Sequence, residues 1–171
     1  MWETIVADAA GESPLWAEAV LERDGRPIEP VFSVLAPPEL ALGIETIYEG
    51  YLVHYGSSRL FMPGDDDVAL LLGDYLYAHG LVRVAETGNI AAVADLAELI
   101  ALCAQARADS RAGDGVAWAA TCASIGEGVL DGARATMRLN GDESHLLASA
   151  SRIAGVERLE RVLAAHAALV G

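Results

Sequence analysis

The sequence predicts an all-α fold, a bundle of helices joined by short loops. Apolar residues recur at intervals of three and four along most of the chain, which is typical of helices with one buried face. No segment shows the alternation of a half-buried strand, and no internal repeat is visible. Hydrophobic residues make up 53% of the 171 residues and charged residues 21%, a composition typical of one globular domain with a sizeable core.

Residues 1–37 are predicted to form a short helix and a proline-rich arm. Ser13 and Pro14 match the N-cap and the first position of a helix, and the residues before them are expected to be frayed. The arm is expected to be extended and to wrap around the bundle formed by residues 38–171, because prolines interrupt regular structure. These prolines are Pro27, Pro30, Pro37 and Pro38.

Residues 38–55 are predicted to form the first long helix, with a continuous apolar stripe. Glu45 and Glu49 lie beside this stripe. They are four residues apart, so their carboxylates are expected to share one face of the helix.

The segment Val68–Val84 is predicted to be the central helix of the bundle, because it is apolar on nearly every side. Asp65–Asp67 precede it and are interpreted as the cap of its N-terminus. Asp74 lies inside the apolar segment, where a carboxylate needs hydrogen-bond partners. We therefore expect Asp74 to be a buried polar point of the core or a residue that lines a pocket.

The rest of the chain is predicted to be helical as well. Asn89 can cap the next helix, and a longer one is expected to run unbroken from residue 116 to residue 139, with Arg134 on its solvated side. Gly155 is expected to separate the last two helices.

The charge of the chain argues against two classes of partner. The net charge is −14, and all 11 basic residues are arginines, so nucleic acid and anionic membrane surfaces are disfavoured. No uninterrupted apolar run is long enough to predict a membrane span, and the N-terminus does not resemble a signal peptide.

Cys103 and Cys122 match no metal or redox spacing and are expected to be small core residues in a reducing compartment. Together these features predict a cytoplasmic protein.

Glu45 and Glu49 are the candidate metal ligands. Two carboxylates at this spacing can share a Mg²⁺ ion, which prefers oxygen ligands. The alternative is that both are solvated surface residues. The chain contains no G-x-S-x-G motif, P-loop or G-x-G-x-x-G motif, so no nucleophile or nucleotide-binding loop is predicted.

The segment Ala69–Ala78, ALLLGDYLYA, resembles the A-x-L-x-G-D-x-L-x-A helix of the trans-isoprenyl (polyprenyl) diphosphate synthases. Counting 29 positions back from Asp74 reaches Glu45, where the first aspartate-rich motif of that family, D-D-x-x-D, is expected. Glu45 and Glu49 match its first and last acids, and Thr46 replaces the middle one. The resemblance covers roughly residues 38–155 and implies a shortened isoprenoid-synthase fold.

The same resemblance implies a protein that is catalytically incomplete. Prenyl transfer uses several Mg²⁺ ions to neutralise the leaving diphosphate, but the second aspartate-rich motif of the family has no match in this chain. The family includes non-catalytic small subunits that pair with a catalytic subunit and tune product length. The resemblance thus implies helix-mediated association, as a homo-oligomer or with a complete prenyl synthase.

Two alternatives stay open. The protein could be a Mg²⁺-dependent isoprenyl diphosphate-binding protein or enzyme, with Glu45, Glu49 and Asp74 lining its pocket. It could also be a helical scaffold whose partner the sequence does not identify.

Overall fold

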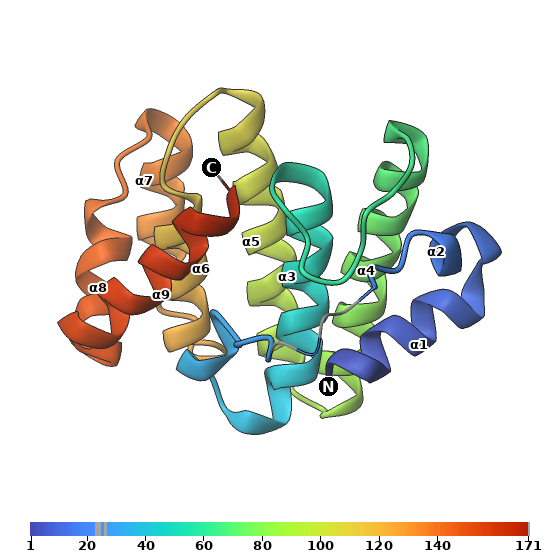
Figure 1. Cartoon of the computed structure of the whole chain (residues 1–171). Coiled ribbons are helices and arrows are strands. Elements are labelled where there is room, and N and C mark those ends of the chain that lie inside the picture. The colour runs from blue at the N-terminus through green and yellow to red at the C-terminus, as the bar shows by residue number, and fades with distance from the viewer. Residues whose placement is uncertain (23–24, 26, 171) are drawn as a thin grey trace.

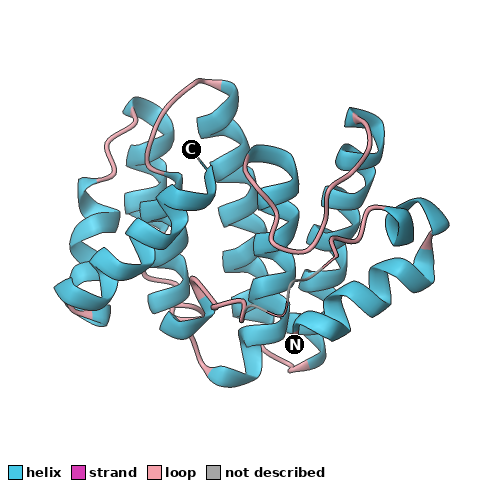
Figure 2. Cartoon of the chain, in the orientation of Figure 1, coloured by secondary structure: helices cyan, strands magenta, loops and turns pink. Residues whose placement is uncertain are grey.

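The computed structural model describes residues 1–22, 25 and 27–170, and all the regular elements in this part of the chain are helical, as predicted (Figures 1 and 2). Gly171, the last residue of the predicted bundle, lies outside the described residues. An isolated antiparallel bridge joins Val20 to Phe61. The α-helices are α1 (Trp2–Glu12), α2 (Pro14–Glu18), α3 (Ala41–Tyr55), α4 (Asp66–Glu86), α5 (Ile90–Ala108), α6 (Asp114–Ala123), α7 (Asp131–Asn140), α8 (Ser144–Ala154) and α9 (Val156–Val170), and the 3₁₀ turns are η1 (Ser33–Leu35) and η2 (Pro38–Leu40).

The central helix is α3, and the prediction that Val68–Val84 occupies this place is wrong. Every residue of α3 from Gly43 to Leu52 is buried. In Figure 1, α3 lies between α4 on one side and α5, α6 and α9 on the other. Helix α4 packs one face against α3 and leaves the opposite face exposed, because an all-round apolar composition does not determine which side a helix buries.

Glycines bring α3 and α4 into backbone contact. A Cβ atom on Gly80 would lie 2.5 Å from Cγ1 of Ile47 and 2.8 Å from the carbonyl oxygen of Gly43. A Cβ atom on Gly50 would lie 2.8 Å from the carbonyl oxygen of Gly73. Side chains larger than hydrogen at these positions would push the two helices apart.

Local capping signals mark the helix boundaries where the sequence predicted them. The carboxylate of Asp65 accepts a hydrogen bond from the backbone N–H of Val68 at 2.8 Å. The side chain of Asn89 accepts one from Ala92 at 3.0 Å. Gly155, with φ +81°, separates α8 from α9 as expected.

The N-terminal segment is more ordered than predicted. The residues before Ser13 were expected to be frayed, but they form α1, which buries Ile5 and Ala9 in a second apolar cluster with Leu72 and Leu76 of α4. This cluster gives the segment an apolar face to pack, and so stabilises a helix that has weak local signals.

The predicted helix over residues 116–139 is in fact two helices. It breaks between α6 and α7, where Gly126 and Gly128 adopt positive φ angles of 83° and 65°. The break turns α7 so that Arg134 is buried instead of solvated, and its guanidinium donates to Asp95 at 2.8 Å.

Helix α4 is long and apolar enough to cross a membrane by length and composition alone, although no uninterrupted apolar run predicted a span. Core helices of bundles meet the same criterion. A single helix that meets this criterion is weak support for a span.

Candidate functional site

Glu45 and Glu49 lie at the centre of a buried polar site on α3. Neither side chain is exposed to solvent, so the alternative that they are solvated surface residues is wrong. The arm contacts the site through Ser33, and the loop after α3 contacts it through Ser58 and Arg59.

Arg59 joins the two carboxylates. Its Nε donates to Oε1 of Glu49 at 2.5 Å, and its Nη2 donates to Oε2 of Glu45 at 2.8 Å. The remaining oxygens are also occupied. Oε1 of Glu45 accepts from the Ser33 hydroxyl at 2.7 Å and from the backbone N–H groups of Val31 and Ser33, and Oε2 of Glu49 accepts from the Ser58 hydroxyl at 2.6 Å.

The charges in this site are strongly coupled. Burial raises the pKa of Glu49 above its ordinary value, while Arg59 and Ser58 oppose that shift. Burial alone would disfavour the charged form of Arg59, but Glu49 and Glu45 outweigh it and raise the pKa of Arg59. The guanidinium is therefore a permanent counter-ion for two carboxylates that water does not reach.

This arrangement bears directly on the predicted Mg²⁺ site. All four carboxylate oxygens of Glu45 and Glu49 already accept hydrogen bonds. Among the residues that the structure describes, no group of three or more His, Cys, Asp and Glu side chains is arranged to hold a metal ion. Magnesium at Glu45 and Glu49 remains a prediction, and it requires Arg59 to leave.

The polar site continues from Arg59 into the aromatic core. The guanidinium lies over the ring of Tyr48, 5.1 Å from its centroid, and over Trp2 at 4.7 Å. The hydroxyl of Tyr48 is 2.9 Å from Nδ1 of His166 on α9, and Nε2 of His166 is 3.7 Å from Oδ1 of Asp114 on α6.

Asp114 ends this chain of polar contacts. Its Oδ2 accepts hydrogen bonds from the hydroxyl of Tyr51 and from Arg107 of α5. Burial would raise the pKa of Asp114, but the His166 ring, the Tyr51 hydroxyl and Arg107 outweigh it and hold that pKa well below its usual range. The contacts from Glu45 to Asp114 thus link the arm, α3, α5, α6 and α9, and within this chain Nε2 of the buried His166 is a polar atom without a hydrogen-bond partner among the described residues.

Asp74 does not belong to this site, and the prediction that it is a buried polar point is wrong. Its side chain is 65% exposed, and Oδ1 lies 3.3 Å from Nε2 of His54. A Cβ atom on Gly73 would collide with the His54 ring, so the glycine leaves room for this histidine and Asp74 is its ion-pair partner. Burial lowers the pKa of His54, and Asp74 opposes that shift.

Sequence reasoning missed Arg59 altogether. It lies in a loop, 10 and 14 residues beyond Glu49 and Glu45, and no helical spacing links it to them. One available signal was that two glutamates beside an apolar stripe need a cation if they are buried.

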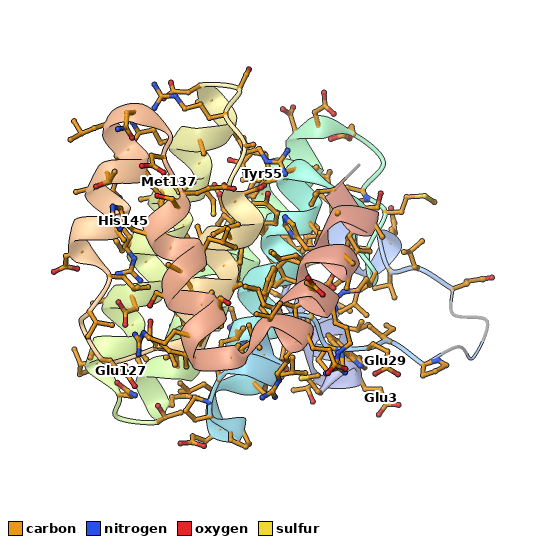
Figure 3. The ribbon with its side chains drawn as sticks, turned by 90° about the vertical axis from the view of Figure 1, so that its left-hand side faces the viewer. Glu3, Glu29, Tyr55, Glu127, Met137 and His145 are labelled. Carbon is orange, nitrogen blue, oxygen red and sulfur yellow. The ribbon has the colours of Figure 1, made fainter. Side chains whose placement is uncertain are left out.

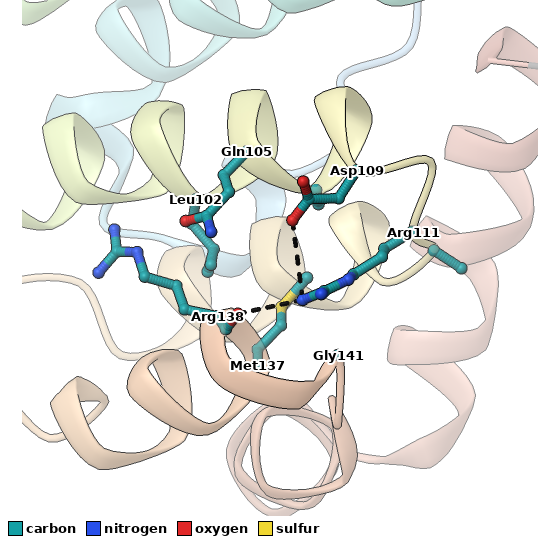
Figure 4. Close-up of a pocket in the computed structure, with 9 residues that line it drawn as sticks. Leu102, Gln105, Asp109, Arg111, Met137, Arg138 and Gly141 are labelled. Atoms are coloured by element: carbon teal, nitrogen blue, oxygen red, sulfur yellow. Dashed lines mark hydrogen bonds and ion pairs between the residues drawn. The ribbon is translucent and has the colours of Figure 1, made fainter.

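A surface depression contains two arginines, Arg111 and Arg138, whose charges are already paired with carboxylates. It lies between α5 and α7 (Figure 4), where Nη1 of Arg111 donates to the carbonyl oxygen of Arg138 at 3.1 Å and lies 3.8 Å from Oδ2 of Asp109. Arg138 itself pairs with Glu98.

Comparison of the chain with protein-family models, with curated proteins and with solved structures finds no match.

Proposed function

We propose that the protein is a non-catalytic helical partner that binds a second helical protein through the outward face of α4. The observation that carries this proposal is a row of apolar side chains that no other described element covers. Leu70, Leu71 and Val82 are 54%, 59% and 53% exposed. The outward face of α4 consists of Leu70, Leu71, Asp74, Ala78, Val82 and Ala85, all of them exposed.

The spacing of these residues places them on one side of the helix, opposite the glycines that contact α3. Single exposed apolar residues are common, but a row of them along one helix is typical of an interaction surface. Full burial of a large aliphatic side chain contributes roughly 1.5–3 kcal/mol. Leu70, Leu71 and Val82 are about half exposed, so a partner that covers all three gains roughly 3 kcal/mol of binding free energy from them.

Charge favours a different protein over a second copy of the chain. Asp66 and Asp67 lie at one end of the face, Asp74 within it and Glu86 at the other end. Two copies would bring these acids together on chains that each carry a net charge of −14. A partner helix with an apolar stripe between arginines or lysines is complementary to this face.

The buried site on α3 supports the non-catalytic part of the proposal. Glu45 and Glu49, which align with the first aspartate-rich motif of the prenyl synthases, hold Arg59 in place of metal ions. The partner that the resemblance implies is a complete prenyl diphosphate synthase, whose product length the protein would tune.

Co-expression with a complete prenyl synthase from the same genome tests the proposal. The wild type should co-purify with the synthase and change its product length, and a Leu71→Glu, Val82→Glu variant should do neither. Leu139→Glu is the matched control, because Leu139 is 83% exposed on α7, away from the outward face of α4. No co-purification of the wild type, or equal loss with the control, would refute the proposal, and binding to neutral lipid vesicles would indicate a membrane-associated α4 instead.

A further inference from the structure

A depression lies between the arm and α9, away from the outward face of α4. Its volume is about 720 Å³, which is in the range of small-molecule sites. Glu29, labelled in Figure 3, lies at the arm side of this depression. The residues that line it include Glu29, Val31, Val34, Arg158, Arg161 and Val162.

Two arginines of α9 give this depression a positive side. Arg158 and Arg161 are three residues apart, so they share one face of the helix. Arg158 lies in the first turn of α9, where the helix dipole adds positive potential. Nη2 of Arg158 donates to the carbonyl oxygen of Val34, which fixes this guanidinium at the edge of the depression.

These arginines differ from most others in the described chain. Six arginines there form ion pairs with carboxylates, as expected for so acidic a protein: Arg59, Arg83, Arg107, Arg111, Arg134 and Arg138. Neither Arg158 nor Arg161 pairs with a carboxylate of the described residues, although Glu29 lines the same depression. The two guanidiniums therefore face the depression with donors to spare.

We propose that this depression binds an organic anion, with a phosphate or carboxylate head on Arg158 and Arg161 and an apolar body against Val31, Val34 and Val162. Guanidinium groups bind such heads through paired, charge-assisted hydrogen bonds. The carboxylate of Glu29 repels an anionic head from the arm side, so the head sits on the α9 side. Val34, which is partly exposed, offers apolar surface that a free inorganic ion would not use, whereas Val31 and Val162 are only 3% and 5% exposed.

Calorimetric titration with defined probes tests this proposal. Octyl phosphate carries both the head and the apolar body, inorganic phosphate carries only the head, and octyl glucoside has a neutral head. We expect octyl phosphate to bind more tightly than the other two, and its affinity to fall as salt is raised. Arg161→Gln should weaken its binding about tenfold, the loss expected for one charge-assisted hydrogen bond.

Arg152→Gln is the matched control, since Arg152 is an exposed arginine on α8 that does not line the depression. Both variants should keep the circular dichroism spectrum of the wild type, because the substituted side chains are exposed. Equal binding of octyl phosphate and octyl glucoside would overturn the proposal. Equal effects of Arg161→Gln and Arg152→Gln on octyl phosphate binding would also overturn it. Inorganic phosphate binding as tightly as octyl phosphate would overturn the assignment of an apolar body to the ligand.

Discussion

Replacement of Arg59 by methionine should strongly destabilise the fold. Glu45 and Glu49 are both fully buried, and Arg59 is the cation that they share. Removing one partner of a buried ion pair costs about 3–5 kcal/mol, because the remaining charge is left without compensation. In a chain of this length, that loss corresponds to a fall in melting temperature of roughly 6–20 °C.

Urea denaturation followed by circular dichroism measures this loss. Arg111→Met is the matched control, because the Arg111 side chain is 40% exposed and its Nη1 lies 3.8 Å from Oδ2 of Asp109, and surface pairs of this kind contribute about 0–1 kcal/mol. A triple variant that adds Glu45→Gln and Glu49→Gln to Arg59→Met should recover most of the lost stability, since it removes the unpaired charges. An Arg59→Met variant within about 1 kcal/mol of the wild type would refute the reasoning.

Three other predictions follow from the packing and the charges. Gly80→Ala should lower the free energy of unfolding, measured in urea, by about 1–2 kcal/mol, because overpacking against Ile47 and the α3 backbone exceeds the gain of about 1 kcal/mol in helix propensity. Gly132→Ala, which has open space around it, should not destabilise the fold. Equal changes in the free energy of unfolding for the two variants would contradict the close packing of α3 and α4. Asp114 has a lowered pKa, so its ionised form stabilises the fold above the unfolded-state pKa of about 4, and this contribution is lost as the pH falls below that value. The free energy of unfolding should therefore fall less steeply with acid in Asp114→Asn than in the wild type. Parallel curves of unfolding free energy against pH for the variant and the wild type would count against the depressed pKa. Mg²⁺ alone should leave the wild-type melting temperature unchanged, because Arg59 occupies Glu45 and Glu49; a rise that Glu45→Ala abolishes would instead support the Mg²⁺-dependent alternative.

Local features of the fold were predictable from the sequence. The helix starts at Asp65 and Asn89 depend on a side chain that bonds to a backbone N–H three residues later, and such contacts are visible in the sequence. The break at Gly155 is equally local. These features need no knowledge of the tertiary structure.

The candidate site was not predictable in the same way. Glu45 and Glu49 were correctly placed on one face of a helix, but their partner, Arg59, comes from a loop that only the fold brings back over α3. Arg134 was predicted to be solvated, and it is buried because the chain turns at Gly126 and α7 packs onto Asp95. In each case the partner is fixed by tertiary packing, and the helical period along the sequence carries no information about it.

The exposed face of α4 was not predictable from the helical period either. An apolar segment predicts burial, but it does not say whether this chain or another protein provides the cover. Leu70, Leu71 and Val82 are apolar residues that this chain leaves uncovered, and this is the basis for expecting a partner.

The most direct test of that expectation is the binding isotherm of a purified complete prenyl synthase with the wild type, Leu71→Glu and Leu139→Glu. The outward face of α4 predicts saturable binding of the wild type, binding of Leu139→Glu within about twofold of it, and a loss of more than about tenfold for Leu71→Glu, since a charge would then be buried in the interface. Equal affinities for all three proteins would contradict the assignment of the binding surface to α4.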